Sequence, residues 1–167
     1  MEIKIKEQLL MEAAERSFDS FLATVTDAIK DGIGGELRAD NMSAISAAQT
    51  TLLAYDTLRS EVMDGGFVQL IHNGYGPFIF LNPFAKVLKM WGLRDLARLI
   101  GKGHKLFVKY RDEIERNCDD ETFMAMFEHY PEMDDLDDCF VENEEEWTAS
   151  LATYVDEHLS DFVTVER

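Results

Sequence analysis

Apolar residues recur at three- and four-residue steps along most of this chain, and this spacing constrains the fold more than any other feature. The first such set consists of Leu9, Leu10, Ala13, Ala14, Phe18, Phe21, Leu22, Val25 and Ile29. The spacing puts them on one side of a helix, so it predicts one long amphipathic helix that the glycines after Ile33 close. Residues 43–63 predict a second helix, with Asn41 or Ser43 as its N-cap. No segment alternates as a half-buried strand does.

Glycine and proline divide the rest of the chain into further helices. Two turns follow Gly66, a short helix begins at Asn82-Pro83, and a long one occupies residues 93–117. Two more are expected from about Asp120 to Tyr130 and from about Glu142 to Phe162. With 167 residues, 46% of them hydrophobic, the chain can bury one core. We therefore predict a single all-α domain over residues 1–167, an irregularly packed bundle of about six or seven helices.

The net charge of −17 belongs entirely to the last third of the chain. Residues 1–111 hold thirteen acids and fourteen bases, whereas residues 112–167 hold twenty acids and two bases. No apolar run is long enough to cross a bilayer, and the N-terminus lacks the basic-then-apolar order of a secretion signal. Cys118 and Cys139 are isolated from each other, which suits a reducing compartment. These features predict a cytoplasmic protein with no membrane partner.

The motif EVMDGGFVQLIHNGYGP, residues 61–77, has two interpretations. Its glycines follow a helix and no lysine comes next, so a phosphate-binding loop is disfavoured. Glu61, Gln69, His72 and Asn73 could line a pocket for acid–base chemistry or a small ligand, which would make the protein an enzyme or a ligand-binding protein. The interpretation we favour is a helix–glycine–helix corner. Gln69 and Asn73 would then satisfy backbone groups freed at the break, with Glu61 in solvent or paired with Arg59.

Two other charged features give weaker signals. The four histidines are far apart, and the acidic run 134–138 lacks the glycine and donor spacing of a calcium loop, so neither a metal nor a cofactor is predicted. Residues 86–111 carry eight bases and one acid. Because the whole chain is strongly negative, we expect this stretch to pair with the acidic third or to be a solvated face, without direct nucleic-acid binding.

Residues 112–146 hold sixteen acids and one base, on segments whose apolar periodicity indicates packed helices. A solvated surface that confers solubility is the plainer interpretation. Fixed carboxylates could instead bind a basic protein. One row of acids, one per 5.4 Å turn, is sparser than DNA phosphates, but rows from neighbouring helices or from a homodimer would approach duplex density. The candidate partner-binding residues are Asp119, Asp120, Glu121, Asp134, Asp135, Asp137, Asp138, Glu142, Glu144, Glu145 and Glu146.

The glycine motif also carries a resemblance. Its matching positions are Glu61, Val62, Gly65, Gly66, Phe67, Gln69, Asn73 and Gly76, whereas Asp64 and Leu70 depart from the usual pattern. This pattern resembles that of a bacterial family of unknown-function domains that includes a DNA-mimic protein. The resemblance implies an all-helical fold and a DNA-binding protein, such as a transcription factor, as the partner. It gives no catalytic residue, and it makes the Gly-Gly corner a signature of the fold.

Overall fold

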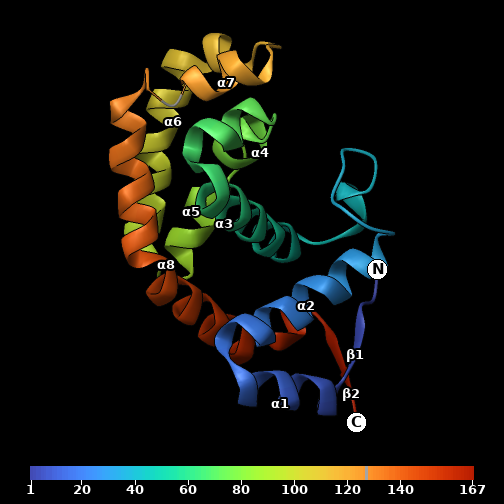
Figure 1. Ribbon diagram of the computed structural model, residues 1–167. Helices are drawn as coiled ribbons and strands as arrows, with labels where there is room; N and C mark the ends of the chain where they lie inside the picture. The colour runs from blue at the N-terminus through green and yellow to red at the C-terminus, as the bar shows by residue number, and fades with distance from the viewer. Residues whose placement is uncertain (127) are drawn as a thin grey trace. The chain divides into compact units, whose positions relative to one another are not determined.

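The computed structural model describes residues 1–126 and 128–167, and its architecture is helical, as the periodicity predicts (Figure 1). Within these residues there are eight α-helices rather than six or seven. The elements are β1 Lys4–Lys6, α1 Glu7–Arg16, α2 Phe18–Gly32, η1 Met42–Ala44, α3 Ala47–His72, α4 Gly76–Phe80, α5 Phe84–Met90, α6 Arg94–Glu115, α7 Asp120–Met126, α8 Pro131–Glu157, η2 Leu159–Asp161 and β2 Thr164–Glu166. The predicted all-α class is confirmed.

The chain forms two compact units. The terminal unit consists of residues 1–56 and 145–167, and the central unit consists of residues 57–144. The long helices α3 and α8 each contribute one part to either unit. In the described part of the chain, no helix has both the length and the apolar composition needed to cross a membrane.

The terminal unit corrects two predictions. The expected long first helix is two helices, because Ser17 has extended backbone and its Oγ accepts a hydrogen bond from the Ser20 N–H at 2.9 Å. That contact starts α2 as an N-cap does, and the apolar period continues through the break. The unit also contains a parallel pair of three-residue strands, β1 and β2, with Ile5 opposite Val165. Strands this short are too brief to show the alternation by which a strand is predicted.

The start of α3 is held by a reciprocal cap that the sequence analysis missed. The Gln49 N–H donates to Ser46 Oγ at 3.1 Å, and the Ser46 N–H donates to Gln49 Oε1 at 2.8 Å. Gln49 also donates to the backbone oxygen of Phe162 at 2.7 Å. Asn41 instead precedes η1, so the prediction that Asn41 or Ser43 caps the second helix is wrong. The Gln49 side chain thus joins the beginning of α3 to the C-terminal segment.

The central unit is built around aromatic side chains. Phe67, Phe80 and Phe107 are buried, and the Phe80 and Phe107 rings stack at 5.3 Å. A Cβ at Gly103 would lie 2.8 Å from the Phe80 ring, so glycine at this position allows α6 to approach that ring.

The helix α6 also contacts α8. Figure 1 shows α6 beside the first half of α8, and the Tyr110 hydroxyl donates a hydrogen bond to Glu132 at 2.7 Å.

The last long helix begins earlier than predicted. It starts at Pro131 instead of near Glu142, and it ends at Glu157 instead of Phe162. Proline at the first helical position is a usual start because its missing N–H would have no intrahelical partner there. The acidic run from Asp134 to Glu146 is therefore helical throughout. In the predicted helix from 120 to 130, α7 occupies Asp120–Met126, and residue 127 lies outside the described residues.

Candidate functional site

One face of α8 carries exposed carboxylates along the central unit. Asp134, Asp138 and Glu142 follow one another at four-residue steps, Asp135 lies beside them, and all four are exposed. Four helical residues rise about 6 Å, so these acids form a line along the helix axis. Met133, Leu136 and Phe140 are buried on the opposite side. The helix thus anchors its apolar face in the core and holds these acids outward. Glu145 and Glu146 are also exposed, on the following turn of α8.

Two acids of the predicted set face inward. Asp137 is half-buried and Glu144 is 6% exposed, and they are seven residues apart, which puts them on the same side of the helix. Glu144 forms an ion pair with Arg59 of α3. Asp137 accepts a hydrogen bond from the Phe67 N–H at 2.8 Å. Both carboxylates therefore join α8 to α3 within the central unit.

Asp137 meets α3 at the Gly65-Gly66 corner. The backbone there leaves the helical conformation, with φ −147° at Gly65 and φ 77°, ψ −176° at Gly66. A Cβ on Gly66 would collide with the Asp137 carboxylate. The positive φ and the close carboxylate both favour glycine at this position. Because Phe67 begins the second part of α3, Asp137 satisfies an N–H that a new helix start leaves without an intrahelical partner.

This position changes the acidity of Asp137. Burial raises its pKa to about 6, against an ordinary value of 3.8. The Phe67 N–H opposes this rise by stabilising the charged form, whereas the negative charges of Asp134 and Asp138 add to it. Asp137 therefore changes its charge closer to neutral pH than an ordinary aspartate does.

The polar residues of the glycine motif form a cluster of their own. Gln69 and Asn73 both donate to Glu61 Oε2, at 2.7 and 3.1 Å, and Gln69 also donates to Asp64 at 3.0 Å. The prediction that these amides satisfy backbone groups is wrong, because the acceptors are carboxylates. Arg59, the base expected beside Glu61, pairs with Glu144. The cluster thus links Glu61 and Asp64, before the glycines, to Gln69 and Asn73, after them.

The contacts of His72 are with α6 and α7, not with the Glu61 cluster. Its Nδ1 lies 2.8 Å from the Ile114 backbone oxygen, and its ring stacks on Phe123 at 4.4 Å. The pocket alternative needs this imidazole beside the Glu61 carboxylate. The observed contacts give His72 a packing role against α6 and α7, so the geometry does not favour that alternative.

The acids before and within α7 have different roles. Asp119 accepts a hydrogen bond from the Thr122 N–H at 2.7 Å, and its hydrogen bonds to Thr122 lower the pKa of the Asp119 carboxyl. Asp120 and Glu121 are exposed in the first turn of α7. Carboxylates here also interact favourably with the positive end of the helix dipole. Asp119 thus caps a helix, while Asp120 and Glu121 remain open to solvent.

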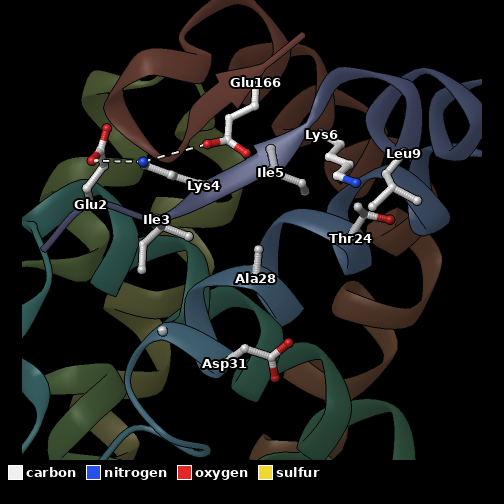
Figure 2. A pocket seen from close by; sticks show the side chains of 11 residues that line it. Glu2, Ile3, Lys4, Ile5, Lys6, Leu9, Thr24, Ala28, Asp31 and Glu166 are labelled. Atoms are coloured by element: carbon white, nitrogen blue, oxygen red, sulfur yellow. Dashed lines mark ion pairs between the residues drawn. The ribbon is translucent and has the colours of Figure 1, made fainter.

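A groove of about 670 Å³ lies elsewhere, along β1 in the terminal unit (Figure 2). Lys4 projects there between Glu2 and Glu166, at 3.8 and 3.6 Å from their oxygens. Residues of α2, among them Thr24 and Ala28, form the other side. None of the predicted site residues lines this groove. Lys4, Glu2 and Glu166 partly balance one another's charge, and Lys6 and Asp31 also line the groove.

Comparison with known proteins shows the family of the chain. A family model described as DMP19-like protein matches residues 43–158, which include the Gly65-Gly66 corner and the exposed carboxylates of α8. A protein of Neisseria meningitidis serogroup B named DNA mimic protein DMP19 is 31% identical over 127 residues, covering 75% of this chain and 77% of that protein. The family resemblance predicted from the glycine motif is confirmed.

Proposed function

Because this chain belongs to the DMP19-like protein family, we propose that it is a DNA mimic that binds a DNA-binding protein through exposed carboxylates of α8. Asp134, Asp135, Asp138 and Glu142 form the centre of this surface, which we call the acidic face. Asp120, Glu121, Glu145 and Glu146 extend the set of exposed acids. The partner contributes the arginines and lysines that would otherwise contact DNA phosphates.

The observation that carries the proposal is the separation of these acids from the bases of the chain. Across residues 1–126 and 128–167, no lysine or arginine is paired with any member of the acidic face. An acid that served the fold would have a partner inside the molecule, as Glu144 does. Within the described residues, no internal lysine or arginine therefore competes with a partner for the acidic face.

The charge density of the acidic face supports a phosphate-like role. Its four carboxylates lie within nine residues of helix, a rise of about 12 Å from first to last, or about one charge per 4 Å. One strand of DNA carries a charge per roughly 3.4 Å of axis. A single helix therefore comes close to the charge spacing of one strand. The rigid backbone of α8 also keeps these charges from spreading as those of a disordered tail would.

The experiment replaces the charges of the acidic face while leaving its shape. The test variant is Asp134→Asn, Asp135→Asn, Asp138→Asn and Glu142→Gln. The control, Asp27→Asn, Asp31→Asn, Asp156→Asn and Glu15→Gln, removes the same number of exposed acids from the terminal unit. Each protein is immobilised and used to capture DNA-binding proteins from a bacterial lysate at low salt. Duplex DNA is then added to release them.

We expect the unmodified protein and the control to capture a DNA-binding protein that duplex DNA and salt both release. The acidic-face variant should retain less than about one tenth of it, because four exposed charge pairs of about 0.5 kcal/mol each are lost. Equal capture by the two variants would refute the assignment of the acidic face. A captured protein that duplex DNA fails to displace would refute the mimicry.

A further inference from the structure

The long helix α6 has a basic outer face that the proposed function does not use. Its exposed cations occur at four- and three-residue steps and are Arg94, Arg98, Lys102, Lys105 and Lys109. On a helix these positions fall within an arc of about 80°, in a row that rises about 22 Å. The buried residues of α6, among them Leu99, Gly103 and Phe107, lie on the opposite side. We call this row the basic face.

Lys109, at the end of the basic face, lies over the Tyr110 ring and interacts with the Glu132 carboxylate of the acidic third. The other four cations are not neutralised by that third, contrary to one of the two expectations from the sequence. Among the residues that the structure describes, Arg94, Lys102 and Lys105 form no ion pair. Arg98 pairs only with Asp95 of its own helix at 3.3 Å, where both side chains are largely exposed. Such an exposed ion pair contributes little to stability and leaves Arg98 accessible. The basic face is therefore open to a partner from outside the molecule.

A glycine beside the row gives an independent indication of a partner. Gly101 is exposed in the middle of α6, and a Cβ there would meet no atom within 4 Å. Gly103, by contrast, makes room for Phe80. Gly101 weakens the helix relative to alanine, and no packing inside the molecule explains it. Val108, seven residues on, lies on the same side and is 61% exposed. A small residue and an apolar one thus border the cations.

From these observations we propose that the outer face of α6 docks an acidic amphipathic helix of another protein. Carboxylates at four-residue steps on that helix repeat every 6 Å or so, which matches the cation spacing. Gly101 allows its backbone to approach closely, and Val108 receives an apolar side chain. A nucleic acid would suit the surface less well, because its charge extends beyond α6 and the chain as a whole is strongly negative. This inference does not depend on the proposed function.

The test uses defined probes and fluorescence anisotropy at low salt. The first probe is a labelled synthetic helix of about 18 residues, roughly 27 Å long, with glutamates at four-residue steps and leucines on the adjoining side. The second is a peptide of the same composition in scrambled order. The third is a single-stranded DNA oligonucleotide of the same net charge. The protein variants are Arg94→Gln/Lys102→Gln/Lys105→Gln and, as a control of equal charge, Lys6→Gln/Arg16→Gln/Arg167→Gln.

We expect the ordered helix to bind more tightly than either other probe. The α6 triple variant should weaken that binding about tenfold, since three exposed charge contacts are removed, while the control should stay within about twofold. Gly101→Leu should also weaken it, although this change leaves the charge intact. Circular dichroism checks that each variant keeps its helix content. The acidic-face variant should bind the ordered helix at least as well as the unmodified protein.

Three results would overturn the proposal. Equal binding of the ordered and scrambled peptides would mean that binding does not depend on the spacing of the cations on α6. Tighter binding of the oligonucleotide, lost in the α6 triple variant, would assign the surface to nucleic acid. Self-association that the triple variant abolishes, measured by sedimentation, would assign it to a second copy of this chain.

Discussion

The outward and inward sides of α8 both carry carboxylates, and these carboxylates have different roles. Outward, Asp134, Asp138 and Glu142 meet solvent, and inward Asp137 and Glu144 meet α3. Only a rotation about the helix axis separates the two groups. A carboxylate that loses water needs a specific partner, whereas one in water does not. The comparison teaches that a run of acids has no single role, because its helical phase divides it into structural and surface members.

The strongest way to break this comparison is to remove the corner against which the inward acids dock. Gly66→Ala should lower the free energy of unfolding by about 3 kcal/mol, since alanine is strained at this positive φ and its Cβ collides with Asp137. Urea denaturation followed by circular dichroism measures it. Gly101→Ala is the matched control and should stabilise the protein by about 1 kcal/mol, because Gly101 has helical backbone and open space. Equal effects at the two glycines would contradict the assigned corner.

A pair of substitutions two residues apart compares the two sides directly. Glu144→Ala should destabilise the protein by about 2 kcal/mol, because it removes a nearly buried carboxylate that forms an ion pair with the partly buried Arg59 guanidinium. Glu142→Ala should change stability by less than about 0.5 kcal/mol, since that side chain is exposed. Thermal unfolding at neutral pH measures both. If Glu142→Ala proved as damaging as Glu144→Ala, the helical phase described above would be wrong.

The smallest expected effect concerns pH. The pKa of Asp137 is about 6 in the folded protein against an ordinary 3.8, so the folded state holds a proton that the unfolded chain has released. Stability from this group is present below pH about 4 and is lost as pH rises through about 6. Asp137→Asn keeps an oxygen for the Phe67 N–H but does not ionise. It should therefore gain about 1 kcal/mol relative to the unmodified protein between these limits, after allowance for solvent screening.

Urea denaturation at a series of pH values tests this difference. Asp138→Asn is the control, because that side chain lies on the outer face and is exposed. The stability difference between Asp137→Asn and the unmodified protein should grow from pH 4 to pH 7. A difference that stays constant over this range would show that Asp137 does not titrate as its burial requires.

Helical periodicity was enough to predict the fold class, but not every boundary. The pattern runs through Ser17 because the apolar positions before and after the break stay in phase, so only the capping serine marks the division. Pro131 is a local start signal for α8, eleven residues before the start predicted from the apolar stripe alone. The strands β1 and β2 could not be predicted locally, because each has three residues and pairs across nearly the whole chain.

The sequence shows the acidic region, but the prediction did not separate the exposed acids from those that face the core. Helical spacing alone puts Asp137 and Glu144 with Phe140 on the buried side, so an earlier helix start would have revealed two structural acids. Their partners, Arg59 and the Phe67 N–H, are more than sixty residues away along the chain. No local pattern identifies such contacts. The family resemblance could be identified without knowledge of such contacts, because the glycine motif is one contiguous stretch of sequence.

The parallel pairing of β1 with β2 has a mechanical consequence. Because the two strands run in the same direction, a pull applied through Met1 and Arg167 acts along both strands in opposite senses. The load then falls on their hydrogen bonds together, in shear, instead of opening them one by one as a hairpin opens. Tension between the two ends would therefore meet its first resistance at this small sheet, before any helix is drawn out.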